Sequence, residues 1–187
     1  ICLLLGYPAA YIMAMADFKT PQVMAMLFIL PMWINFLLRT IATVELFRMF
    51  GLPLGEGALL FGMVYDFLPF MIYPIYNTLQ KMDTSLIEAA HDLGAKRHQV
   101  FMKVTLPLSV PGIYSGIVMV FMPTVSTFAI AELLTHNKVT LFGSLIQRCF
   151  GEGGIAMWNY GAALSLIMLI IIGLTSFFGG DKEDINR

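Results

Sequence analysis

The chain has 187 residues, of which 58% are hydrophobic and only 12% are charged, and its mean hydropathy is +0.79. Soluble domains carry about 25% charged residues because their surfaces face water, so this composition excludes an ordinary soluble domain and indicates a surface partly covered by lipid. The net charge of −1 excludes a general basic surface for nucleic acid.

Five apolar stretches are long enough, or nearly long enough, to cross a membrane, which takes about 20 mostly apolar residues. They are Ile1–Ala16, Pro21–Leu38, Ala58–Leu79, Val104–Ala131 and Gly153–Gly180. The first is short and opens without Met, so we expect a truncated N-terminus and six spans in the full chain. The last two have 28 residues each. Since one span needs fewer, we expect a turn, an interfacial piece or a tilted helix within each.

The basic residues predict an orientation for these spans. The longest polar stretch, Gln80–Lys103, lies between the third and fourth spans. If it is cytoplasmic, seven of the eleven Lys and Arg residues lie on that side and four on the other. Cytoplasmic loops are enriched in Lys and Arg, so we expect Lys96 on the cytoplasmic side and Lys138 on the outer side.

This polar stretch predicts two short helices separated by a glycine. The segment Asp83–Pro107 reads DTSLIEAAHDLGAKRHQVFMKVTLP. Ser85 and Glu88 fit a capping box at the start of the first helix, and Gly94 stands where a left-handed cap would end it. A second helix fits within Ala95–Val104 and is expected to end before the proline. The apolar residues of the first helix share one face: Leu86, Ala90 and Leu93.

The sequence carries no pattern typical of an enzyme or a metal site. His91 and His98 lie seven residues apart in this loop, and His136 is expected on the opposite side of the membrane. Cys2 and Cys149 form no ligand motif and are interpreted as small apolar fillers. There is no GxxxxGK[ST] loop, so energy from ATP would have to come from a partner. We expect no catalytic residue, no metal and no cofactor.

The loop has the spacing of a known motif. Glu88-Ala89-Ala90, Gly94, Val104 and Leu106-Pro107 match E-A-A-x3-G-x9-I-x-L-P, with Val in place of Ile. This resembles the EAA loop of permeases of ATP-driven (ABC-type) importers. Several further segments resemble the spermidine/putrescine branch of that family, and they extend the likeness over nearly the whole chain: Gly6-Tyr7-Pro8, Pro31-Met32-Trp33, Gly62-Met63-Val64-Tyr65, Leu68-Pro69-Phe70-Met71, Pro74-Ile75-Tyr76 and Pro111-Gly112-Ile113.

The resemblance implies an all-α, polytopic transmembrane bundle in the bacterial inner membrane, with residues 1–187 forming one permease domain. Residues 83–107 would be the coupling loop that docks on the ATPase, through Glu88, Ala89, Ala90, Gly94, Leu106 and Pro107. Glu88 would cap its helix, contact the partner, or do both. The implied partners are ABC ATPase subunits, a second permease subunit, an extracytoplasmic solute-binding protein and the bilayer. One departure is the connection Arg39–Gly57, which is short for such permeases.

Ionisable groups at membrane depth usually face a cavity or a partner. A polyamine is a flexible polycation, and carboxylates with aromatic rings would suit its path. The candidates for the wall of that path are Tyr65, Asp66, Tyr73 and Glu132. In the alternative interpretation, Asp66 pairs with a neighbouring helix and Glu132 lies at the membrane interface.

Two other transport functions stay open from the sequence. One is an ABC importer permease for another small solute. The other is a stand-alone secondary transporter, which would explain the spans and Asp66. It would not explain the spacing from Glu88 to Pro107, and the repeats typical of such transporters are not visible.

Overall fold

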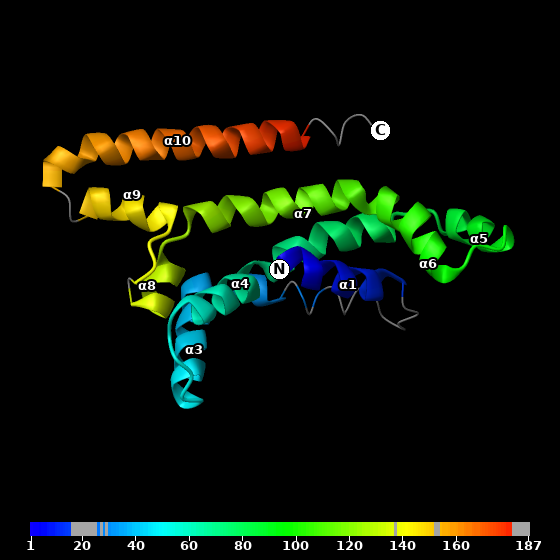
Figure 1. The fold of residues 1–187 in the computed structure, drawn as a ribbon, viewed down its shortest axis with the longest axis horizontal. Coiled ribbons are helices and arrows are strands. Elements are labelled where there is room, and N and C mark those ends of the chain that lie inside the picture. The colour runs from blue at the N-terminus through cyan, green and yellow to red at the C-terminus, as the bar shows by residue number, and fades with distance from the viewer. Residues whose placement is uncertain (16–25, 27, 29, 137, 152–153, 181–187) are drawn as a thin grey trace.

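The computed structural model describes residues 1–15, 26, 28, 30–136, 138–151 and 154–180, and the described chain contains helices without strands (Figure 1). The all-α prediction is therefore confirmed. In chain order the elements are α1 (Cys2–Met15), the 3-10 helix η1 (Leu30–Trp33), α3 (Phe36–Met49), α4 (Glu56–Gln80), α5 (Thr84–Asp92), α6 (Arg97–Val100), the π-helical turn η2 (Phe101–Thr105), α7 (Leu106–Ser126), α8 (Ala129–Thr135), α9 (Phe142–Gly151) and α10 (Gly154–Gly180).

Three of the five predicted spans are confirmed as helices long and apolar enough to cross a membrane. They cover Glu56–Gln80, Arg97–Ser126 and Met157–Ser176. The first predicted span corresponds to α1, a shorter apolar helix of 14 residues. Helices α5 and α6 lie at one end of the molecule, and α8 and α9 lie towards the other end (Figure 1). Lys96 stands between α5 and α6 in the chain and Lys138 between α8 and α9, so the two residues belong to opposite ends.

The second predicted span, Pro21–Leu38, lies largely outside the described residues, and its described end differs from the prediction. The chain forms η1 and then starts a new helix at Phe36. Asn35 caps that helix, because its side chain accepts a hydrogen bond from the Leu37 N–H at 2.9 Å. The expected short connection from Arg39 to Gly57 is therefore mostly helix α3, which lies across one end of α4 (Figure 1).

The fourth predicted span contains the expected interruption. Helix α7 ends at Ser126, Thr127 is extended, and the short α8 follows. The Ser126 hydroxyl donates to the carbonyl oxygens of Met122 and Pro123, which satisfies acceptors at the helix end. The fifth predicted span has no such turn, since α10 is one helix of 27 residues.

Helix α4 is the centre of the packing. One apolar cluster joins it to α1 through Tyr7, Ala10, Met13, Met71, Ile72, Ile75, Tyr76 and Leu79. A second cluster joins it to α3 and α8 through Val44, Ala58, Leu59, Phe67, Ile130, Ala131 and Leu134. On α7, Gly112 and Gly116 face α4, and a Cβ on either would clash with Thr78 or Met71. The lack of side chains there lets α7 and α4 pack at close distance.

Candidate functional site

The first helix of the predicted coupling loop begins two residues earlier than a Ser85 cap requires. Asp83 is the N-cap, and its carboxylate accepts a hydrogen bond from the Ser85 N–H at 2.9 Å. The predicted capping box of Ser85 and Glu88 is therefore wrong. Asp caps as well as Ser does, and its negative charge also suits the positive helix end, so the upstream carboxylate takes this position. Glu88 is left exposed in the middle of α5.

The same contacts act on the charge of Asp83. Hydrogen bonds from the Ser85 hydroxyl and from its backbone N–H stabilise the carboxylate and hold the pKa of Asp83 below its usual value. Asp83 is therefore ionised at neutral pH, which is the form that accepts the cap hydrogen bond and suits the helix dipole.

The predicted left-handed end of α5 at Gly94 is confirmed. Gly94 has φ of 80°, its N–H donates to the His91 carbonyl at 2.8 Å, and the Ala95 N–H donates to the Ala90 carbonyl at 3.1 Å. This pair of hydrogen bonds is a Schellman motif. A Cβ at Gly94 would meet nothing within 4 Å, so the backbone conformation, and not space, favours glycine.

Helix α5 presents an apolar surface to its surroundings. None of its residues is buried, and Leu86 and Leu93 are 47% and 89% exposed. Glu88 and Ala89 are exposed too, and Ala90 is half-buried. An exposed apolar face on a capped helix suits contact with another protein.

The second helix of the loop does not end before Pro107, contrary to the prediction. Helix α6 begins after Lys96, whose N–H donates to the Gln99 side chain at 2.9 Å, and it continues through the π turn into α7. Pro107 has no N–H, and its ring would clash with a regular α-helical turn before it. The π turn accommodates this, with the Leu106 N–H donating to the Phe101 carbonyl five residues back. Leu106 and Pro107 therefore start α7 and do not end the loop.

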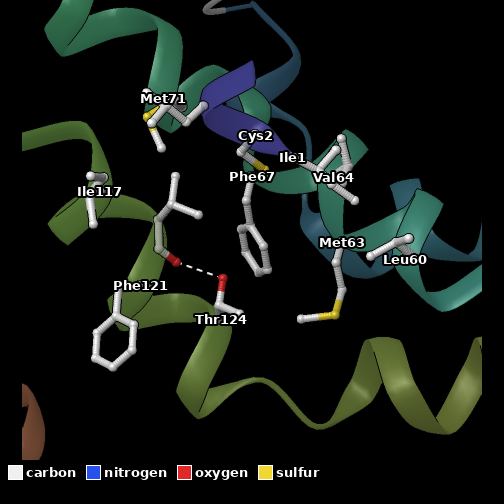
Figure 2. A pocket seen from close by; sticks show the side chains of 12 residues that line it. Ile1, Cys2, Leu60, Met63, Val64, Phe67, Met71, Ile117, Phe121 and Thr124 are labelled. Carbon is white, nitrogen blue, oxygen red and sulfur yellow. Dashed lines mark hydrogen bonds between the residues drawn. The ribbon is translucent and has the colours of Figure 1, made fainter. Parts of the chain in front are cut away.

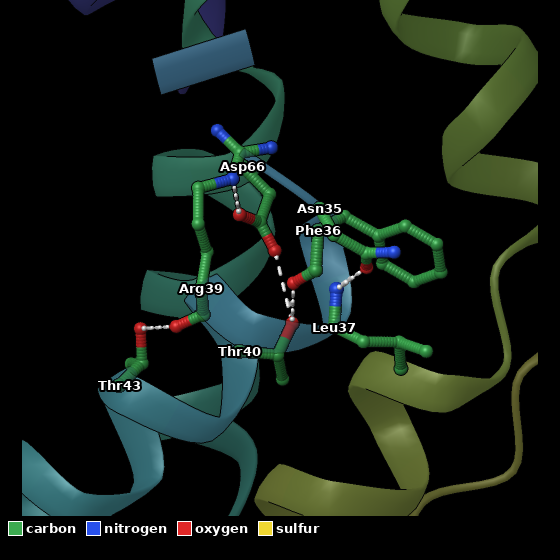
Figure 3. A network of polar contacts seen from close by, with 7 residues as sticks. All are labelled: Asn35, Phe36, Leu37, Arg39, Thr40, Thr43 and Asp66. Atoms are coloured by element: carbon green, nitrogen blue, oxygen red, sulfur yellow. Dashed lines mark hydrogen bonds and ion pairs between the residues drawn. The ribbon is translucent and has the colours of Figure 1, made fainter. Parts of the chain in front are cut away.

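The carboxylate of Asp66 is paired within the protein (Figure 3). Its Oδ1 lies 3.2 Å from Arg39 Nε, and its Oδ2 accepts a hydrogen bond from the Thr40 hydroxyl at 3.2 Å. Asp66 is 1% exposed and Arg39 is 6% exposed. The two residues belong to α4 and α3, so a buried ion pair joins these helices, as in the alternative interpretation of Asp66.

The pair is completed by an aromatic ring. The Arg39 guanidinium carbon lies 5.8 Å from the ring centre of Tyr65, within the range of a cation–π contact. Arg39 Nη1 is buried without a hydrogen-bond acceptor among the described residues. Because a buried charge is costly when it is incompletely paired, Arg39 depends strongly on Asp66.

Of the other three path candidates, Tyr65 joins the Asp66 pair through Arg39. Tyr65 and Tyr73 on α4 are 44% and 43% exposed, and Glu132 is exposed in the first turn of α8. Tyr65 stacks on Phe61 with ring centres 6.5 Å apart. These side chains are available to a partner or a cargo, whereas Asp66 is not.

An open apolar hollow of 390 Å³ lies between α1, α4 and α7 (Figure 2). Met63, Phe67, Met71 and Phe121 are among its lining residues, and Thr124 turns its hydroxyl to the Val120 carbonyl. None of the four path candidates lines it. A hollow of this kind suits a hydrocarbon chain better than a polycation.

Two tertiary contacts could not be predicted from the sequence. Arg39 directly follows the second predicted span, and nothing in the sequence links it to Asp66. The available indication was that both are isolated charges in apolar surroundings, which tend to pair. The contact of Phe101 with Tyr7 and Tyr11, described below, had no sequence indication. No group of three His, Cys, Asp or Glu side chains in the described part of the chain could hold a metal ion.

Comparisons with known proteins agree with this arrangement. A family described as "Binding-protein-dependent transport system inner membrane component" matches residues 6–180. The chain is 35% identical, over 92% of its length and 68% of the relative's, to the spermidine/putrescine transport system permease protein PotB of Escherichia coli. The protein of the same name from Haemophilus influenzae is 36% identical over 95% of this chain and 67% of its own length.

A solved structure supports the fold. One chain of the inward-facing MetNI methionine ABC transporter matches with a TM-score of 0.67 at 19% identity, covering 95% of this chain and 84% of that one. The relatives found are named as transport permeases and not as enzymes.

Proposed function

The chain belongs to the family of binding-protein-dependent transport system inner membrane components, and from this premise we propose that it is the permease subunit of an ATP-driven importer of the polyamines spermidine and putrescine. It is a multi-pass protein of the bacterial inner membrane. We propose that it has no enzymatic activity of its own, and that ATP is hydrolysed on a separate ATPase subunit.

The coupling role is supported by one observation above all, the exposed loop helix joined to a membrane span. Helix α5 is capped at both ends by neighbouring residues, so the hydrogen bonds that set its ends are local. It displays Leu86, Glu88, Ala89 and Leu93 to a partner. Beyond Gly94, helical structure runs unbroken from Arg97 to Ser126. Force applied by an ATPase at residues 83–107 would therefore reach the membrane helices directly.

The cargo is proposed from the likeness to the spermidine/putrescine permeases. The exposed aromatic residues Tyr65 and Tyr73, together with Glu132, would provide rings and a carboxylate to a passing polycation. Asp66 is 1% exposed and paired with Arg39 and Thr40, so we propose that it keeps α3 on α4 and supports this path without touching the cargo.

The partners follow from the same proposal. The family depends on a binding protein, and the exposed charges around α3 and α8 lie at the end of the molecule opposite the coupling loop, where such a protein would dock. A second permease subunit would cover the exposed apolar faces that the described chain leaves open. An importer for another small solute is the alternative.

The proposal is tested by purifying the full-length protein with its associated subunits and measuring uptake into proteoliposomes. We expect the ATPase to co-purify, and spermidine or putrescine to enter only with ATP and the binding protein present. Binding-protein-stimulated ATP hydrolysis without polyamine uptake would indicate another cargo. Uptake driven by an ion gradient in the absence of an ATPase would point to a secondary transporter.

A further inference from the structure

The first residue of the π turn is held between two aromatic rings of a different helix. The Phe101 ring lies 5.9 Å from the ring of Tyr7 and 5.3 Å from the ring of Tyr11, measured between centres. The interplanar angles are 77° and 87°, so both contacts are edge-to-face. This geometry is favourable and directional, because the edge of one ring faces the electron-rich face of the other.

A hydrogen bond ties the same part of α1 to the start of α7. The Tyr7 hydroxyl lies 3.0 Å from Ser109 Oγ, and Ser109 Oγ donates to the Leu106 carbonyl at 2.8 Å. Since the serine hydroxyl has one hydrogen, Tyr7 is the donor in their contact. Tyr7 therefore contacts the helix after the loop at two points, one apolar and one polar.

Helix α1 itself is fixed to the centre of the bundle. Tyr7, Ala10 and Met13 are buried against α4. Phe101 stands five residues before Leu106, on the segment that connects the loop with α7. A π turn interrupts the regular α-helical hydrogen-bond pattern and is one of the places where long helices kink. Movement of the loop would therefore displace Phe101 before it displaces the rest of α7.

We propose that Phe101 is a positioning residue that transmits movement of the coupling loop to α1 through Tyr7 and Tyr11. The proposal rests on the function proposed above. Two helices then respond to the ATPase together: α7 by continuity of its backbone, and α1 by contact with the Phe101 ring. Without the ring, α7 would move while α1 stayed behind, and ATP would be hydrolysed with less transport.

The experiment uses the complete transporter in proteoliposomes and measures spermidine imported per ATP hydrolysed. An edge-to-face pair corresponds to about a two- to tenfold change in an equilibrium. We therefore expect Phe101→Leu to lower the ratio by a factor in that range, while assembly and ATP hydrolysis persist. Leu108→Met is the control, since Leu108 lies in α7 just beyond residues 83–107 and is 43% exposed. It should leave the ratio unchanged.

If Phe101→Leu does not assemble, two variants of Tyr11 test the role of the Phe101 ring contact instead. Tyr11→Phe keeps the ring that packs edge-to-face on Phe101 and should behave like the parent. Tyr11→Leu should lower the ratio. The double variant, Tyr11→Leu with Phe101→Leu, should lower the ratio by less than the product of the two single effects. The reason is that both substitutions remove the same contact between the rings of Tyr11 and Phe101.

Equal ratios for Tyr11→Phe and Tyr11→Leu, or a parental ratio for Phe101→Leu, would overturn the proposal. Failure of the proposed cargo looks different, because the parent itself would then import no spermidine. In that case the same variants are compared by the stimulation of ATP hydrolysis that the binding protein causes. The difference between Tyr11→Phe and Tyr11→Leu should also be seen in the stimulation of ATP hydrolysis by the binding protein.

Discussion

The loop around α5 and the crossing of α3 over α4 are built by opposite means. In the loop, the interactions that set the shape join residues at most five apart, from the Asp83 cap to the Schellman motif at Gly94. At the crossing, the deciding contact is the ion pair of Arg39 with Asp66, which joins two different helices and is almost completely buried. The comparison shows that a docking surface can be defined locally, while a joint between membrane helices depends on the whole fold.

Helix α3 contains the same contrast between two ion pairs. Arg48 and Glu45 lie one helical turn apart, 3.0 Å from each other, with both side chains more than half exposed. Arg39 reaches a different helix and is 6% exposed. An exposed pair contributes about 0–1 kcal/mol, whereas removing one partner of a buried pair costs about 3–5 kcal/mol. The two pairs therefore allow a matched test within one helix.

The largest expected effect is all-or-none and tests whether the loop and the outer end lie on opposite sides of the membrane. With Cys2 and Cys149 replaced by serine, Lys96→Cys should react with an impermeant thiol reagent only from the cytoplasmic side. Lys138→Cys should react only from the outside. Both follow from the positions of these residues at opposite ends of the helices (Figure 1). Reaction of both from one side would show that the span assignment is wrong.

The second-largest expected effect concerns the buried ion pair of Arg39 and Asp66. Asp66→Asn removes the charge that Arg39 needs, and we expect it to destabilise the protein by about 3–5 kcal/mol, seen as loss of assembled complex and a lower unfolding temperature in detergent. Asp66→Asn combined with Arg39→Gln should recover part of the loss, since no buried charge remains unpaired. Glu45→Gln breaks the exposed pair and should cost less than about 1 kcal/mol.

One result would support the interpretation in which Asp66 lines the path of the cargo. If Asp66→Asn assembles with parental stability and only polyamine uptake falls, the carboxylate faces a wet path and contacts the cargo. If both stability and uptake are unchanged, Asp66 has neither role. The stability measurement thus separates a residue that holds the helices from one that lines the path.

What could be predicted from the sequence follows the same division. The glycine cap and the helix–glycine–helix order are local, so Gly94 was identified correctly. The start of α5 was misplaced because Asp83 and Ser85 both make good caps, and only geometry decides between them. The extension of α6 into α7 was missed because Pro107 normally ends a helix, and a π turn that accommodates it has no distinctive sequence.

The buried contacts could not be predicted, because they depend on which helices meet. Asp66 is a charge within a predicted span, but its partner Arg39 directly follows the stretch predicted as a span ending at Leu38, with no sign that a new helix has begun. The break at Asn35 puts Arg39 in a separate helix that crosses α4. The path candidates Tyr65, Tyr73 and Glu132 remain predictions.

A smaller effect tests the coupling loop itself. Gly94→Val forces a β-branched residue into the left-handed region, at a cost of about 1–2 kcal/mol. We expect about a tenfold loss of ATPase binding or of transport per ATP, with normal membrane insertion. Gly51→Val is the control, because Gly51 has φ of 64° and equally open surroundings outside the loop. Its strain is similar, and it should leave coupling intact. Parental coupling in Gly94→Val would remove the basis for the loop's proposed role.

The smallest effect is the pH dependence of the α5 cap. Hydrogen bonds from Ser85 lower the pKa of Asp83 in the folded loop. A lowered pKa means that the stabilisation is fully present above the usual Asp value of about 3.9 and is lost as pH falls through the folded pKa. Protection of the Ser85 amide from hydrogen exchange should therefore be constant from neutral pH down to that value and fall only below it. Asp83→Asn keeps an acceptor and should remove the pH dependence, whereas Asp83→Ala should lower protection at every pH. A loss of protection that begins well above pH 5 would assign the control of the cap to another group, and the local origin of this docking surface would have to be abandoned.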